Sequence, residues 1–321
     1  MAKRYLDEKM EKTKEKAGSD CTLRELRSAW IQANESIWKP ATLANNSVQS
    51  KLIFQNLGWD TLVPRLSARY VSENIIAPGE KCSKKRRIAE FKKVMRWGFR
   101  HDYVKDIAWL DKLETPQEKK KDDVEEKFLE NSECKKLLAE ITNETHRDLT
   151  LFLLLTGCRI GEALALTVKD IDLRERVVHI TKGLYSAKKI VTTPKTGSSI
   201  RDVYIQDELF LLCKKLQKQA KINSLRQNCD LLFQKNGDFL SYRTYERNLM
   251  TAGQNSLGRR VTPHMLRHTH ASLLAEKGVE IGTISRRLGH ESSQITRQIY
   301  LHVTKKVRER DKEKVKEVCF F

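Results

Sequence analysis

A charged segment at residues 114–127, ETPQEKKKDDVEEK, constrains the fold of this chain more than any other feature. The segment contains a proline, carries dense charge of both signs and shows no apolar periodicity, so it matches neither a helix stripe nor a buried strand. Such a composition is typical of a linker. The sequence therefore predicts two domains, at residues 21–113 and 128–305, and a chain of 321 residues is long enough to form two cores.

Residues 21–113 have apolar side chains at spacings of three and four and no strand-like alternation, which predicts a small helical domain. All five tryptophans lie in this region, and we expect them in its core: Trp30, Trp38, Trp59, Trp97 and Trp109. Residues 1–20 mix both charges with little apolar content and end in Gly-Ser-Asp, so they are expected to form a solvated, charged leader.

A strongly basic stretch occupies residues 81–100. It holds nine lysines and arginines and a single acidic residue, Glu90. Written as a helix, it has an apolar stripe on one face and a basic ridge on another. An ordinary solvated helix is the alternative, but solvated faces usually mix both signs of charge. We therefore expect four of these residues to contact the phosphates of a polyanion such as DNA: Lys85, Lys92, Lys93 and Arg96.

The charge of the whole chain points the same way. Lysine and arginine number 61 against 42 aspartates and glutamates, which gives a net charge of +19. A polyanion is the natural partner of such a chain, although charge alone does not choose between DNA, RNA and an anionic membrane. No apolar run approaches the roughly 18 residues of a membrane span. The seven cysteines are an odd number without a C-x-x-C pair, so the sequence indicates neither a disulfide framework nor a zinc site and fits the reducing cytoplasm.

The second region begins near Phe128 and also reads as mostly helical, with the apolar helix DLTLFLLLTG ending at Gly157. Strand signals are confined to RVVHITKG, KKIVTTPKT and SSIRDVYI, which predict a small antiparallel sheet. Further on, LLFQKNGDFLS predicts a hairpin that turns at Asn236 and Gly237. The predicted fold class is mainly α with a small antiparallel β-sheet: a helical domain followed by an α+β domain.

The stretch from Thr262 to Tyr300 gathers groups suited to a phosphate. Thr262 is a good N-cap and Pro263 a good first helical residue, so a helix should begin there with its N–H groups facing an anion. Its first turns place three side chains on one face: His264, Arg267 and His268.

Two more helices should follow within this stretch. Gly278 and Gly289 are expected to end helices, and a last helix carries Tyr300, ten positions after His290. Earlier in the chain, Arg159 directly follows the helix stop at Gly157. An arginine in that position is well aimed for a phosphate, because its planar fork can hold two nonbridging oxygens.

Taken together and in order, TGCRIGE, HMLRHTH, LGH and Tyr300 resemble the boxes of the tyrosine recombinase (phage integrase) family. The stretches LRHTHASLLAEKG and TPKTGSSIRDVYI are most similar to integrases of Gram-positive phages, genomic islands or conjugative transposons. The resemblance implies a helical core-binding domain and a catalytic domain that close around DNA. It also implies a catalytic set without metal or cofactor: Arg159, Lys195, His264, Arg267, His290 and Tyr300.

The resemblance also implies a role for each residue. Tyr300 is the nucleophile and forms a 3′-phosphotyrosyl intermediate. The two arginines, aided by His264 and His290, stabilise the charge of the transition state, and Glu162 supports Arg159. His264 is the expected base. Lys195, in a turn between strands, is the expected acid.

The function that follows is site-specific DNA recombination. The expected partners are double-stranded attachment sites, three further copies of the chain in a synaptic tetramer formed from free monomers, and in some systems a directionality factor. The tail, residues 306–321, is expected to pack on a neighbouring protomer, and residues 1–20 are too short for the arm-binding domain found in some members. The expected location is the bacterial cytoplasm. The alternatives are an Xer-like dimer resolvase, a type IB topoisomerase and a regulator that binds zinc through histidines 264, 268, 270 and 290.

Overall fold

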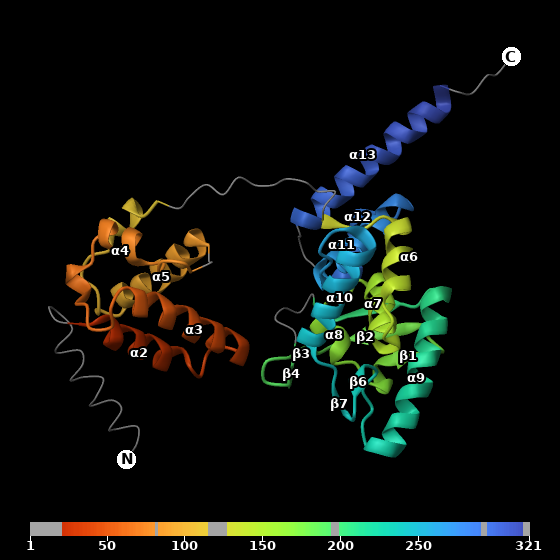
Figure 1. Ribbon diagram of the computed structural model, residues 1–321, viewed down its shortest axis with the longest axis horizontal. Coiled ribbons are helices and arrows are strands. Elements are labelled where there is room, and N and C mark those ends of the chain that lie inside the picture. The colour runs from red at the N-terminus through yellow and green to blue at the C-terminus, as the bar shows by residue number, and fades with distance from the viewer. Residues whose placement is uncertain (1–20, 81–82, 115–126, 194–198, 290–293, 317–321) are drawn as a thin grey trace. The chain divides into compact units, whose positions relative to one another are not determined.

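The computed structural model describes residues 21–80, 83–114, 127–193, 199–289 and 294–316 (Figure 1). The chain divides into two compact units between Lys120 and Lys121. Across the described residues, no helix is both long and apolar enough to cross a bilayer.

The first unit is helical, as the spacing of its apolar residues predicts. Its helices are α2 (Leu23–Asn34), α3 (Pro40–Asn56), α4 (Ala68–Asn74) and α5 (Lys84–Arg100), with short 3-10 turns η1 (Val63–Arg65) and η2 (Ala108–Lys112). Helix α2 begins with a capping box, in which Thr22 accepts a hydrogen bond from the backbone N–H of Glu25 and the Glu25 carboxylate accepts one from Thr22. These reciprocal bonds satisfy donors that the helix itself leaves unpaired.

The tryptophans contribute to the core of the first unit as predicted. Trp30 and Trp97 are buried, and the other three are partly buried against the same cluster. Helix α5 lies with its apolar stripe in this core, where three of its side chains are fully buried: Ile88, Phe91 and Met95. The basic stretch is therefore an amphipathic helix anchored on one side.

The second unit is also mainly helical. Its helices are α6 (Asn131–Glu140), α7 (Glu144–Thr156), α8 (Ile160–Leu164), η4 (Val168–Asp170), α9 (Asp207–Gln227), α10 (Tyr242–Leu257), α11 (Pro263–Glu276), α12 (Ile281–Leu288) and α13 (Gln294–Lys316). Its strands are β1 (Ile171–Asp172), β2 (Val177–Ile180), β3 (Gly183–Tyr185), β4 (Ile190–Thr192), β5 (Arg201–Tyr204), β6 (Gln234–Lys235) and β7 (Asp238–Phe239). Helix α13 runs to Lys316 without a break between residues 305 and 306, where we expected the catalytic domain to end and a tail to begin.

The strands are antiparallel, but they do not form the single sheet that the sequence predicted. Strands β1, β2 and β5 make one ladder, and β3 pairs with β4 in another. The expected first strand, RVVHITKG, is broken after Ile180, and Lys182 is held there by Asp170 at 2.7 Å. Strand β3 then runs against α8. A Cβ on Gly161 would lie 3.0 Å from the Leu184 carbonyl oxygen, so a larger residue there would crowd β3.

The predicted hairpin at Asn236 and Gly237 is confirmed. Strands β6 and β7 flank these two residues, whose φ angles are 53° and 81°. Positive φ at both central positions is the signature of a type I′ turn, for which Asn-Gly is the preferred pair.

Helix α11 packs against α7 and α13 (Figure 1). Its Leu266 belongs to the main core, while Ala271 and Ala275 belong to a smaller cluster with residues of α12 and α13. The first turns of α13 cover α11, and the later turns extend away from the body of the unit (Figure 1). A helix packed on two sides has little surface left for solvent, so several polar residues of α11 are buried: Arg267, Thr269, His270 and Ser272.

Candidate active site

Arg159 lies at the start of α8, directly after the turn that ends α7. Its side chain is 37% exposed, and its Nη1 donates to Glu162 Oε1 at 2.9 Å. The other oxygen of Glu162 accepts the backbone N–H of Arg159 at 2.8 Å. One carboxylate thus holds both the main chain and the guanidinium of Arg159.

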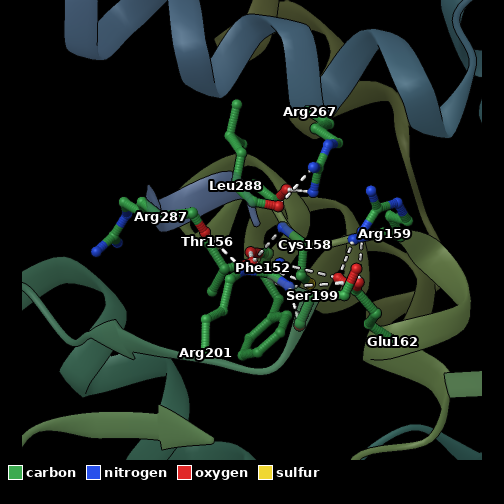
Figure 2. A network of polar contacts seen from close by, with 11 residues as sticks. Phe152, Thr156, Cys158, Arg159, Glu162, Ser199, Arg201, Arg267, Arg287 and Leu288 are labelled. Atoms are coloured by element: carbon green, nitrogen blue, oxygen red, sulfur yellow. Dashed lines mark hydrogen bonds and ion pairs between the residues drawn. The ribbon is translucent and has the colours of Figure 1, made fainter. Parts of the chain in front are cut away.

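Glu162 itself is buried and is held by a second arginine. Arg201, on β5, donates from Nη2 to Oε2 at 2.9 Å and from Nη1 to Oε1 at 3.3 Å (Figure 2). Burial by itself raises the pKa of the Glu162 carboxyl, but the hydrogen bonds and charge of Arg201, with the bonds from Arg159, outweigh it and leave the pKa below its usual range. The carboxylate is therefore ionised at neutral pH.

Arg267 projects from α11 and is 3% exposed. Its Nη1 donates to the Gly157 carbonyl at 2.7 Å and its Nη2 to the Leu288 carbonyl at 2.5 Å (Figure 2). These carbonyls lie at the C-terminal ends of α7 and α12, where backbone oxygens lack helical partners and carry partial negative charge. Burial, and then the charge of Arg159, lower the pKa of Arg267 to about 9.

The C-terminal end of α7 depends on a glycine and a buried histidine. Gly157 has φ +66°, and a Cβ there would lie 2.5 Å from the ring of His270. His270 is 4% exposed, and its Nδ1 lies 2.7 Å from the Leu154 carbonyl while its Nε2 accepts from Arg287 at 3.0 Å. These partners assign the proton to Nδ1. Burial, and then the charge of Arg287, lower the pKa of His270 to about 3.

Arg287, at the end of α12, ties three segments together. Besides His270, its guanidinium donates to the Tyr204 carbonyl at 2.9 Å, the Leu155 carbonyl at 3.1 Å and Gln206 Oε1 at 3.1 Å. The end of α12 is therefore fastened to the end of α7 and to β5.

Two other histidines of α11 lie near these arginines. His264 is exposed, yet desolvation of its ring, and then the charges of Arg267 and Arg159, lower its pKa. Burial, and then the neighbouring His264, lower the pKa of His268 to about 4. Both rings are therefore neutral at pH 7, and a neutral imidazole can accept a proton.

Helix α11 begins at Pro263 with Thr262 as its N-cap, as predicted. We expected His264, Arg267 and His268 to share one face of α11. His264 is exposed and His268 is partly buried, whereas Arg267 is buried and points to the C-terminal ends of α7 and α12.

Tyr300 lies on α13 and is partly buried against a small apolar cluster made of Phe128, Ala271, Ala275, Ile284, Leu288, Ile299 and Val303. Its hydroxyl forms no hydrogen bond within the described residues. Leu288 connects this cluster to the arginines, since its side chain belongs to the cluster and its carbonyl accepts from Arg267. The structure thus brings together Arg159, Glu162, His264 and Arg267. His290 and Lys195 lie outside the described residues.

The sequence analysis did not select Arg201 or Arg287. A signal for Arg201 was present, since it alternates with Val203 on the buried face of β5, and an arginine on the inward face of a strand requires a partner. Arg287 lacked such a signal, because a basic residue in the last turn of a helix usually faces solvent.

The basic residues predicted on α5 differ in their surroundings. Lys85 and Arg96 are exposed. Lys92 Nζ donates to the Leu113 carbonyl at 3.3 Å, whereas Lys93 Nζ donates to Asn46 at 3.0 Å and lies over the rings of two tryptophans, Trp30 and Trp38. Lys92 and Lys93 therefore also stabilise the first unit itself.

A zinc-binding regulator is not favoured by this arrangement. Both ring nitrogens of His270 are engaged, one with a carbonyl and one with Arg287. Within the described residues, no three histidine, cysteine or acidic side chains come together as a metal site would require.

The fold and site define a class of protein that acts on phosphate esters: an α+β unit in which two arginines and a neutral histidine converge beside a helix bearing a tyrosine. Comparison with known proteins gives the family. Residues 127–307 match the model of the phage integrase family.

The integrase of Staphylococcus phage L54a is 26% identical over 98% of this chain and 99% of its own length. The ICEBs1 integrase of Bacillus subtilis is 33% identical over 55% of this chain and 50% of its own. Among solved structures, the Tn1549 transposon integrase in complex with transposon right end DNA has a TM-score of 0.69 and 20% identity, and covers 92% of this chain and 99% of its own.

The chain belongs to the phage integrase family, and it is a tyrosine site-specific recombinase. The expectations of a mainly helical fold and of an integrase are confirmed. The resolvase, topoisomerase and regulator alternatives are not favoured.

Proposed function

We propose that this recombinase cuts and rejoins double-stranded DNA at attachment sites through a covalent bond between Tyr300 and a 3′-phosphate. The observation that carries the proposal is that Arg159 and Arg267 are held close to each other. One is partly exposed and held by a carboxylate, and the other is buried on two helix ends. Positive charge fixed in this way is preorganised for a phosphate rather than scattered over a surface.

The chemistry begins with attack of the Tyr300 hydroxyl oxygen on phosphorus. A P–O bond to Tyr300 forms, the bond from phosphorus to the 5′-oxygen breaks, and that oxygen leaves as a 5′-hydroxyl after taking up a proton. The two guanidiniums stabilise the charge that gathers on the nonbridging oxygens. Because the phosphodiester energy is retained in the tyrosyl bond, a 5′-hydroxyl from another duplex can reverse the step without ATP.

Proton transfer is assigned to the groups nearest the reacting oxygens. A tyrosine has an ordinary pKa near 10 and needs a base or a cationic setting to attack at neutral pH. His264 is neutral at pH 7 because its pKa is lowered, and it lies in the first turn of α11 beside both arginines. We assign it as the base. Lys195 is assigned as the acid that protonates the 5′-oxygen, and His290 as a further donor to the phosphate.

Recognition of the duplex is assigned in part to the first unit. Lys85 and Arg96 are exposed on α5 beside Lys92 and Lys93, and basic side chains there suit phosphates of the DNA backbone. A λ integrase tetramer bound to a Holliday junction is among the similar solved structures, with 18% identity, a TM-score of 0.65 and coverage of 87% of this chain and 77% of that one. We propose the same tetrameric assembly here, with strand exchange in the bacterial cytoplasm. The need for a directionality factor stays a prediction.

The test is to trap and locate the covalent bond. DNA crosslinked to the protein in cells is sequenced to find the target, and a suicide duplex of that sequence is incubated with the purified chain. We expect a denaturation-resistant adduct in which mass spectrometry finds a nucleotide 3′-phosphate on Tyr300. An adduct on another residue, or one joined through a 5′-phosphate, would reject the proposal.

A further inference from the structure

Arg201 has no part in the chemistry above, yet it is among the most constrained side chains of the second unit. Its side chain is 6% exposed. It donates to both oxygens of Glu162, to the Ser199 carbonyl at 3.0 Å and, from Nε, to the Arg287 carbonyl at 2.7 Å (Figure 2). An arginine on a four-residue strand thus contacts Glu162 of α8, which holds Arg159, and the end of α12, whose Leu288 carbonyl accepts from Arg267.

The contact with Glu162 controls Arg159. Both oxygens of Glu162 also accept from Arg159, one from the guanidinium and one from the backbone. These bonds are strong only while the carboxylate is ionised. Without Arg201 the pKa of this buried carboxyl would rise, because burial raises it and Arg201 contributes more than Arg159 to lowering it. Protonated Glu162 would hold Arg159 weakly.

The contact with the Arg287 carbonyl controls the end of α12. Arg287 and Leu288 are the last two residues of that helix, and their carbonyls accept from Arg201 and Arg267 respectively. Cationic side chains on these oxygens complement the negative end of the helix dipole. Arg201 and Arg267 therefore donate hydrogen bonds to two consecutive carbonyls, immediately before Gly289.

We propose that Arg201 is a positioning residue for DNA cleavage, which holds Arg159 through Glu162 and the end of α12 through its carbonyl, so that Arg159 and Arg267 meet one phosphate. This inference rests on the proposed function. A purely structural arginine would contribute stability without altering how the cleavage rate depends on pH.

The test compares Arg201→Met, Arg201→Lys and the double variant Arg201→Met/Glu162→Gln with the wild type. The single-turnover rate of cleavage of the suicide duplex is measured at saturating protein from pH 6.5 to 8, together with DNA affinity. Among the described residues, the titratable or charged groups that interact with Glu162 are Arg159, Arg201, Arg267 and Cys158. Over this pH range Cys158 stays neutral, because burial raises its pKa to about 11. Rates are expressed relative to wild type at each pH, which removes the contribution of His264.

We expect Arg201→Met to cleave about 10²-fold more slowly than wild type at the lower pH, the cost of a misplaced catalytic group. Its DNA affinity should stay within about threefold of wild type, since phosphate contacts elsewhere dominate binding. The deficit should shrink as pH rises, because Glu162 with a raised pKa ionises and regains its hold on Arg159. In the double variant this recovery should vanish, since a glutamine does not titrate.

Arg201→Lys keeps a positive charge, so its cleavage rate should fall only about tenfold below wild type. Its deficit should also shrink as pH rises, but by less than that of Arg201→Met. Arg176→Met is the matched control, because Arg176 forms a surface ion pair with Asp207 next to the same sheet, and its rate should equal wild type.

Cleavage by both Arg201 variants at the wild-type rate and with the wild-type pH profile would overturn the inference, as would a deficit that does not change with pH. If Arg201→Met does not fold, Arg201→Lys decides the same question. A wild-type chain that forms no adduct would instead overturn the proposed function and this inference with it.

Discussion

Helix α5 of the first unit and the arginine cluster of the second both concentrate positive charge, and they hold it in opposite ways. Lys85 and Arg96 are exposed on the surface of α5. Arg201 and Arg267 are buried, and each is fixed by carbonyl oxygens from segments distant in the sequence. Exposed cations can follow any phosphate backbone. Buried, fixed cations act at one point, so binding and chemistry are expected to reside in different parts of the chain.

The sharpest test of this division is Tyr300→Phe, which removes one oxygen. Tyr300 is only partly buried and its hydroxyl has no hydrogen bond within the described residues, so the variant should fold normally. We expect complete loss of the covalent adduct and DNA affinity near wild type, measured by denaturing gel and by titration of labelled duplex. A protease-sensitive adduct at the wild-type level would place the nucleophile elsewhere.

The two arginines provide the next largest effect. Arg159→Ala and Arg267→Ala should each slow cleavage by roughly 10²-fold or more, because each removes an aimed donor. They should differ in stability. Arg267→Ala leaves the Gly157 and Leu288 carbonyls without this donor, at about 1–3 kcal/mol for a buried group left unsatisfied, whereas the side chain of Arg159 is partly exposed. Urea unfolding checks this, and equal stability of the two variants would contradict it.

Acid should destabilise the second unit through the buried histidines of α11. Folded His270 has a pKa of about 3 and an unfolded histidine about 6.5, so as pH falls the unfolded chain takes up this proton first. The stabilisation that neutral His270 contributes is complete above pH 6.5. It is lost as the pH falls from 6.5 to 3, at about 1.4 kcal/mol per pH unit. His268, with a pKa of about 4, adds to the slope.

The free energy of unfolding of the second unit, measured in urea at pH 7, 6 and 5, checks this prediction. His270→Asn should lower the free energy of unfolding at every pH. It should also reduce the slope of this free energy against pH by the equivalent of about one bound proton. An unchanged slope would mean that His270 takes up its proton over the same pH range in the folded and the unfolded chain.

The smallest effect is expected on α5. Changing Lys85 and Arg96 together to alanine should weaken DNA binding and lower the salt slope by about one unit for each lost phosphate contact. Cleavage at saturating protein should stay unchanged. Arg69→Ala is a suitable control, because Arg69 is an exposed arginine of α4 paired with Glu73. An unchanged slope in the double variant would mean that this face of α5 meets solvent rather than DNA.

Much of this molecule follows from local pattern. The helix of residues 84–100, the start of α11 at Pro263 and the turn at Asn236 and Gly237 all form where caps, apolar spacing and turn residues predict them. The motifs that identify the family are likewise short contiguous stretches, and their order along the chain makes them specific. These features depend on neighbours within a few positions, so the sequence alone determines them.

The arrangement of charge was decided by the tertiary structure. Arg267 is buried because the ends of α7 and α12 meet at its guanidinium, and no spacing within α11 records that. The partners of Arg201 lie 39 and 86 positions away along the chain. Strand β3 likewise pairs with β4 and lies against Gly161 of α8 rather than continuing β2. Burial and partner choice are properties of contacts between distant segments, and these exist only once the chain has folded.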